Sequence, residues 1–218
     1  MNGIELMSQE KSFMDRLGRL SGRMGATALS HILGCKVNLK VSEIFFIPLE
    51  DIQYLLGDPG IVVAGIQHEF VNELEGYLLT LIPVELAKHH LSHLLKMEVD
   101  EDYMASPQGL SGLGELSNIL CGSYISAIGN MLDIVIIPFM PHVKIDLMGA
   151  ITQDIILRLK PETVQAMIIK TELIIADDVI SIHILMLLEQ DSLKLLSDRI
   201  RLKTGVQENG NFRADKQD

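Results

Sequence analysis

The chain has 218 residues, of which 48% are hydrophobic but only 5% aromatic, and it contains no Trp. This composition is typical of a globular chain with one large, mainly aliphatic core. The formal net charge of −11 argues against a surface that neutralises nucleic-acid phosphates, and it disfavours binding to an anionic membrane surface.

Cysteine usage and the apolar runs predict the compartment. Two cysteines, Cys35 and Cys121, are too few for the disulfide framework of a small secreted protein, and the first residues do not have the pattern of a signal peptide. The most apolar run, residues 131–141, is interrupted by Asp133 and Pro138 and is shorter than the roughly 20 residues of a membrane-spanning helix. We therefore expect a cytoplasmic protein without a transmembrane segment.

The first half of the chain predicts a helix, three strands and another helix. An amphipathic helix is expected over residues 12–34, with Ser12 as its N-cap. A short helix or turn is expected at residues 48–56, and Pro83 suits the first turn of a helix that runs to about Leu95. The three strands are expected at residues 36–46, 61–70 and 76–82.

The second half repeats this order after an acidic, turn-rich linker at residues 99–109. A long helix is expected to begin at Ser111. The later elements are expected as a strand at 134–137 that continues toward Ile145, a short helix at 149–159, strands at 165–174 and 179–188, and a helix at 190–203. Residues 205–218 are polar and are expected to be a disordered tail.

A shift of 99 residues lays one half on the other, with Arg16 on Glu115 and Leu17 on Leu116. We therefore predict a single α+β domain over residues 1–204, made of two repeats at about 10–98 and 107–203. We expect the halves to be pseudo-symmetric, each with a helix-strand-strand-strand-helix order. We also expect them to share a mixed or antiparallel six-stranded sheet that is flanked by helices, as the family resemblance given below implies.

The long second-half helix has the most informative surface. At about 100° per residue, Ser111, Glu115 and Asn118 share one face, followed only by Gly and Ser residues, while the apolar residues share the other. A carboxylate and a carboxamide thus point the same way, one turn apart, where another protein could approach closely. A Glu and an Asn at this spacing also occur on ordinary solvated helix faces, so the spacing alone does not establish a site.

With Pro141 added, the pattern Ser111, Glu115, Asn118 and Pro141 resembles the CheC/CheX/FliY family of chemotaxis response-regulator phosphatases, and CheC above all. The resemblance covers roughly residues 10–200 and includes the segments GELSNILCGSYISAIGNML, DLMGAI and GATALSHILG. It implies an enzyme that hydrolyses the aspartyl phosphate of a CheY-type response regulator, with Glu115 and Asn118 as catalytic residues. Ser111 and Pro141 would support the motif as a helix-start hydroxyl and a turn.

The first helix departs from the family pattern. Arg16 and Arg19 stand where the motif has Glu and Asn, and Ser42 replaces the Pro, although Ser12 matches the motif's Ser. The resemblance therefore implies one intact site and one degenerate site. With Arg23 and Lys11, the two arginines form a basic patch, either an ordinary solvated face or a surface for an acidic partner.

The residue types suit the implied chemistry, because phosphoryl transfer through a loose transition state needs mainly positioning and charge stabilisation. The Asn118 carboxamide can hold and aim a water molecule, and the Glu115 carboxylate suits a charge-assisted bond to a lysine. By the resemblance, the regulator supplies that lysine and the Mg²⁺, so this chain binds no cofactor or metal of its own. The resemblance also implies the receptor deamidase CheD as a partner, bound through the last helix.

Other interpretations stay open. The chain could be a non-catalytic adaptor that binds CheD or a flagellar-switch component. Glu85, His89 and His93 have a spacing that could place metal ligands on one helix face, although a solvated face is more ordinary. Cys121 lies one turn from Asn118, but no Arg follows it six residues later, which favours a buried thiol over a thiol phosphatase. His68, beside apolar strand residues, is expected to be structural.

Overall fold

The computed structural model describes residues 8–95, 97–163, 165–175 and 178–205. The predicted tail lies outside these residues, apart from Gly205. The helices are α1 Ser8–Leu33, α2 Ile52–Leu56, α3 Val84–Leu95, α4 Glu101–Ala105, α5 Pro107–Leu132, α6 Met148–Ile156 and α7 Gln190–Thr204, with a 3-10 turn at Leu49–Asp51. The strands are β1 Val37–Pro48, β2 Val62–Asn72, β3 Gly76–Pro83, β4 Ile136–Pro138, β5 His142–Leu147, β6 Gln165–Ile175 and β7 Asp178–Leu188.

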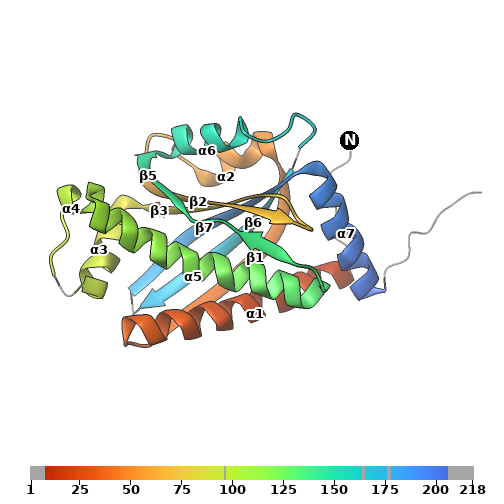
Figure 1. Ribbon diagram of the computed structural model, residues 1–218, viewed down its shortest axis with the longest axis horizontal. Coiled ribbons are helices and arrows are strands. Elements are labelled where there is room, and N and C mark those ends of the chain that lie inside the picture. Colours follow the sequence, from red (N-terminus) through yellow and green to blue (C-terminus); the bar gives the residue numbers. More distant parts are fainter. Residues whose placement is uncertain (1–7, 96, 164, 176–177, 206–218) are drawn as a thin grey trace, which may run out of the picture.

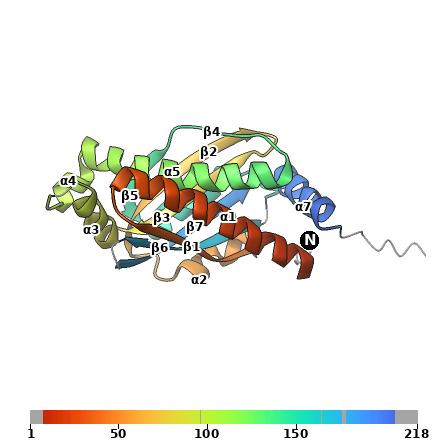
Figure 2. The same ribbon diagram turned by 90° about the horizontal axis from the view of Figure 1, so that it is seen from below.

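The elements form three layers (Figure 1). The two long helices α1 and α5 lie side by side on one face of the sheet, and the short helices α2 and α6 lie on the other. Figure 2, seen from below, shows α1 and α5 in front, with α7 at one end of the molecule and α3 and α4 at the other. The predicted α+β class with helices flanking a sheet is confirmed.

The described strands form one antiparallel sheet in the order β1-β6-β7-β3-β2-β4, with β5 also paired to β2. Because β4 pairs with residues 70–72 and β5 with residues 62–67 of the same strand, the sheet is six strands wide. The counterparts of β1, β2 and β3 in the second half are β4, β6 and β7. When each strand is replaced by its counterpart and the order is read backwards, the same order results. It therefore agrees with the predicted repeat.

The last sheet position is filled by two strands, where the sequence predicted one. The chain leaves the sheet at residues 139–141, after the Phe139 N–H donates to the Glu69 carbonyl at 2.8 Å, and it returns at His142. Pro141 has no N–H to donate to the sheet, which suits a break at this point. The break brings Pro141 to the start of β5, against α5.

Helix α5 begins four residues earlier than predicted. Ser106 is its N-cap, with its Oγ accepting the Gly109 N–H at 3.2 Å, and Pro107 occupies the first helical position. The predicted role of Ser111 as a helix-start hydroxyl is therefore wrong, because Ser111 lies in the second turn. Ser12 is likewise inside α1, which already includes Ser8.

The predicted linker at residues 99–109 also contains structure. Helix α4 occupies its centre, and the Asp100 carboxylate caps this helix by accepting the Tyr103 N–H at 2.7 Å. The sequence pattern missed it because five residues are too short for a helical period to appear. The remaining predicted elements agree with the structure to within a few residues.

Two hydrophobic clusters fill the space on either side of the sheet. Alternation along β3 separates them: Leu78 and Ile82 face the cluster under α1 and α5, whereas Leu79 and Leu81 face the cluster under α2 and α6. Among the described helices, none is both long and apolar enough to cross a membrane.

Candidate functional site

The four motif residues that the sequence singled out line one depression of about 350 Å³ on the surface of α5. Ser111, Glu115 and Asn118 come from α5 and are exposed, and Pro141 comes from the break between β4 and β5. The other lining residues are Pro107, Leu110, Gly114, Met140 and Val143. The fold thus brings Pro141, which follows β4 in the sequence, next to three residues of α5.

Close packing fixes the wall that carries Pro141. Gly114 is buried between Ser111 and Glu115, and a Cβ there would lie 3.4 Å from Pro141 Cγ and 3.5 Å from Val143 Cγ2. The ring of Pro141 therefore covers the helix backbone beside the two candidate catalytic residues. This packing gives Pro141 a second role beyond the predicted turn, because it shapes the depression.

His68 on β2 joins the two walls from beneath. Its Nε2 lies 3.1 Å from the Ser117 hydroxyl on α5, and its Nδ1 lies 3.4 Å from the Phe139 carbonyl in the strand break. Because a carbonyl only accepts hydrogen bonds, Nδ1 carries the proton that faces Phe139, while the Ser117 hydroxyl itself donates to Thr80 Oγ1 at 3.3 Å. Burial lowers the pKa of His68, which favours the neutral ring. The predicted structural role of His68 agrees with this geometry.

The thiol beneath the depression is not a nucleophile. Cys121 is buried, and burial raises the pKa of its thiol to about 12. A thiolate is therefore not formed near neutral pH, which removes the thiol-phosphatase interpretation.

The open face of the depression combines two free polar groups with an apolar rim. Within the described residues, no hydrogen bond or ion pair engages the side chain of Glu115 or Asn118. Phe139 and Met140, in the strand break, are 51% and 84% exposed. An exposed carboxylate, a carboxamide and large apolar side chains together are what a docked protein surface could use.

The other candidates lie elsewhere. Arg16 and Arg19 line a separate groove along α1, and Lys11 does not line it. The side chains of His89 and His93 lie outside the described residues, so the metal interpretation stays a prediction. Among the side chains that the structure does describe, no group of three His, Cys, Asp or Glu could hold a metal ion.

Sequence reasoning missed Met140 and Val143, which line the depression, and the contact between His68 and Ser117. The signal for Ser117 is a polar residue on the mainly apolar buried face of α5. A buried hydroxyl at such a position needs a partner, which the sequence does not identify.

Comparisons with known proteins place these features in context. No family model matches the chain. The curated protein "CheY-P phosphatase CheC" of Bacillus subtilis is 24% identical over 203 residues, which cover 89% of this chain and 94% of that protein.

Solved structures share the fold along most of the chain. Thermotoga maritima FliY gives a TM-score of 0.70 at 18% identity and covers 92% of this chain and 100% of that one. The FliM middle domain from H. pylori gives a TM-score of 0.65 at 10% identity, with 88% and 99% covered. The motif and the full-length similarity to CheC agree with this shared fold. The chain is therefore similar to CheC over most of its length and shares its fold with FliY and the FliM middle domain.

Proposed function

We propose that this protein accelerates hydrolysis of the aspartyl phosphate of a CheY-type response regulator, with Glu115 and Asn118 as its catalytic residues. The observation that carries the proposal is the meeting of Ser111, Glu115, Asn118 and Pro141 at one open depression. The curated relative's name, a CheY-P phosphatase, supports the same class of substrate.

Asn118 would orient the attacking water. Its carboxamide can accept one hydrogen from the water and leave the oxygen lone pair facing phosphorus. Because the side chain is short and starts from a helix, few rotatable bonds need to be fixed when the water is bound. A strong base is not needed for a loose phosphoryl-transfer transition state.

Glu115 would hold the register of the docked regulator. One turn from Asn118, its carboxylate can accept a charge-assisted hydrogen bond from a lysine of the regulator. The Mg²⁺ that neutralises the phosphoryl group would come with the regulator. We assign no metal to the described residues of this chain.

The rim would provide contact area rather than chemistry. Met140 lines the depression and is 84% exposed, and Phe139, which precedes it in the strand break, is 51% exposed. Large apolar side chains next to a polar centre commonly act as anchors when a protein docks. We expect the regulator to bury them when Asn118 reaches its phosphoryl group.

The test is the rate of phosphate loss from a phosphorylated chemotaxis response regulator with the wild-type protein, Asn118→Ala, Glu115→Ala and the control Ser126→Ala. Ser126 is exposed further along the same helix and does not line the depression. We expect Asn118→Ala to lower the rate at saturating protein by about 100-fold, since a misplaced water loses that much. Glu115→Ala should weaken binding by about tenfold or more, because a charge-assisted bond is lost.

Binding measured on the same variants separates chemistry from docking. Asn118→Ala should still bind the regulator activated with beryllofluoride, and Ser126→Ala should match the wild type in both assays. Wild-type protein that binds the regulator without accelerating phosphate loss would overturn the enzyme proposal in favour of the adaptor. CheD, for which α7 would be the docking element, is a further proposed partner and is tested by the same binding assay.

A further inference from the structure

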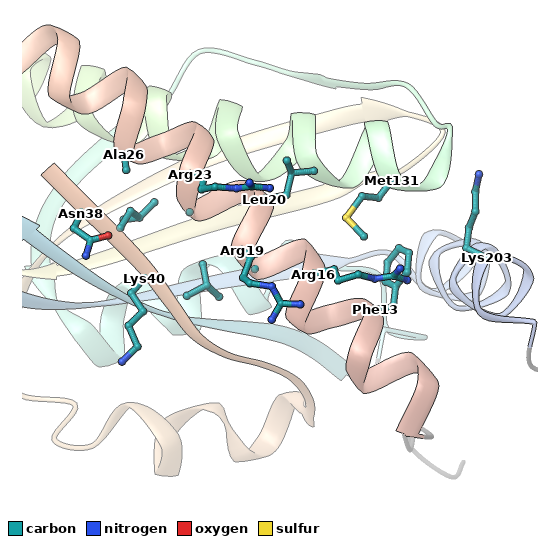
Figure 3. Close-up of a pocket in the computed structure, with 14 residues that line it drawn as sticks. Phe13, Arg16, Arg19, Leu20, Arg23, Ala26, Asn38, Lys40, Met131 and Lys203 are labelled. Atoms are coloured by element: carbon teal, nitrogen blue, oxygen red, sulfur yellow. The ribbon is translucent and has the colours of Figure 1, made fainter.

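A groove with a volume of about 880 Å³ runs along α1. Figure 3 shows its lining, which comes from α1, β1, the end of α5 and α7. Five of the lining residues are cations and none is an acid; the cations are Arg16, Arg19, Arg23, Lys40 and Lys203. In a chain with a formal net charge of −11, this is a local reversal of charge.

The three arginines are available to a ligand. Arg16, Arg19 and Arg23 are exposed, and no ion pair with a described residue engages them. Arg16 lies over the Phe13 ring, with its guanidinium carbon 5.7 Å from the ring centroid. The two lysines differ, because Lys40 pairs with Glu172 at 3.2 Å and Lys203 pairs with Asp133. The free positive charge of the groove therefore belongs to α1.

The arginines do not converge on one point. Arg16 and Arg23 are separated by about 10 Å along the helix axis, at 1.5 Å per residue. In Figure 3 the Arg16 side chain lies next to Phe13, Arg19 turns toward the β1 side and Arg23 extends toward Leu20. A single phosphate would reach only one or two of these groups. A ligand with several negative charges along its length would reach all three.

The floor of the groove is apolar. It includes Leu20 and Met131, both half-buried, together with Leu39 and Val41 of β1. A strongly hydrated polyanion gains little from such a floor, whereas a peptide with apolar side chains can bury them there. The net charge of the whole chain also repels nucleic acid.

We propose that this groove binds an acidic amphipathic segment of a partner protein, whose carboxylates pair with Arg16, Arg19 and Arg23 and whose apolar side chains rest on the groove floor. The guanidinium groups can form bidentate pairs with carboxylates, and their exposure gives them access to solvent and to the ligand. The groove is separate from the α5 depression, so the proposal does not depend on the phosphatase activity.

The probe is a fluorescein-labelled peptide of 15 residues with Glu on one face of a helix and Leu on the other. Its matched control has Gln in place of every Glu. Anisotropy titrations would compare the wild type with the triple variant Arg16→Glu, Arg19→Glu and Arg23→Glu. A control triple variant with the same charge change, Lys36→Glu, Lys160→Glu and Lys194→Glu, replaces exposed lysines that do not line the groove.

We expect the acidic peptide to bind the wild type and the control triple variant equally, and the arginine variant at least about tenfold more weakly. Raising salt from 50 to 300 mM should weaken binding to the wild type, because exposed charges are screened. A triple Arg→Gln variant, which removes charge without reversing it, should show an intermediate affinity. All variants should retain the acceleration of phosphate loss that Asn118→Ala is expected to lower.

Four results would overturn the proposal. The arginine variant could bind the acidic peptide as well as the wild type does, or the Gln peptide could bind as well as the Glu peptide. A single-stranded DNA probe could bind more tightly than the peptide in an arginine-dependent way, which would indicate a nucleic-acid surface. Sedimentation could show that the wild type is a dimer and the arginine variant a monomer, which would make a second copy of the chain the occupant of the groove.

Discussion

At the scale of single residues, Ser117 stands between Glu115 and Asn118 but faces the opposite way. Its hydroxyl lies 3.1 Å from His68 Nε2 and 3.3 Å from Thr80 Oγ1, and all three side chains are buried. The exposed pair and the buried hydroxyl share one helical turn. The geometry of the candidate site therefore depends on a hydrogen-bonded cluster beneath it, because the cluster fixes the rotation of α5 relative to the sheet.

His68 gives this cluster a pH dependence. Its pKa in the folded protein is lowered by burial, whereas in the unfolded chain it is near the ordinary histidine value of 6.5. Below that value the unfolded state binds a proton that the folded state excludes. The contribution of His68 to stability is therefore fully present above pH 6.5 and is lost as the pH falls below it.

We expect the wild type to lose more stability between pH 7.5 and pH 5.5 than His68→Gln does, as measured by urea unfolding at several pH values. His183, whose pKa is also lowered by burial, contributes in the same direction. His183→Gln is therefore the matched comparison, and the double variant should show the smallest pH dependence. An equal pH dependence in His68→Gln and the wild type would contradict the prediction.

At the scale of elements, α1 approaches β1 closely through small residues. A Cβ at Gly22 would lie 2.6 Å from the Leu39 carbonyl oxygen, and a Cβ at Gly25 would lie 2.7 Å from Leu39 Cδ2. The first of these neighbours is backbone, which cannot move aside as a side chain end can. This close approach sets the depth of the arginine-lined groove, because Leu39 forms part of its floor.

We expect Gly22→Ala to lower the free energy of unfolding by about 1–3 kcal/mol, since overpacking forces α1 away from β1. Gly122→Ala is the matched control on α5, where a Cβ would meet no atom within 4 Å. Because alanine has the higher helix propensity, Gly122→Ala should raise stability by up to about 1 kcal/mol. Chemical denaturation of the two variants measures the change in the free energy of unfolding for each. Destabilisation of similar size in both would refute this account of the packing.

At the scale of the whole molecule, the two halves present different chemistry at corresponding places. The α5 depression displays a carboxylate and a carboxamide, whereas the α1 groove displays arginines. Both lie on the same layer of the fold, since α1 and α5 pack side by side on one face of the sheet (Figure 2). The strands of the two halves occupy equivalent positions in the sheet. The difference between the two surfaces therefore comes from their side chains and not from the topology.

We therefore expect one productive docking event per chain. Titration of beryllofluoride-activated regulator into the protein, followed by calorimetry, should give a stoichiometry near one, and Glu115→Ala should weaken that single event. The arginine variant should leave both the stoichiometry and the affinity unchanged. Two equivalent regulators bound per chain would contradict this prediction and would point to a second docking surface of the same kind.

The sequence by itself determined the local features. Helical spacing placed Ser111, Glu115 and Asn118 on one exposed face of α5, and alternation located most strands to within a few residues. Such patterns depend on residues that are neighbours along the chain, and a regular backbone repeats them with a fixed period. The family resemblance supplied the proposed chemical roles, which geometry alone does not assign.

Only the tertiary structure decided which distant residues meet. His68 reaches the Phe139 carbonyl across 71 residues of sequence, the strand break brings Pro141 onto α5, and α1, β1 and α7 together line the arginine groove. These contacts depend on how whole elements pack, and no periodicity in the sequence encodes a contact between two elements. For the same reason the sequence located the candidate catalytic pair but neither the apolar residues of the strand break nor the hydrogen bonds beneath the pair.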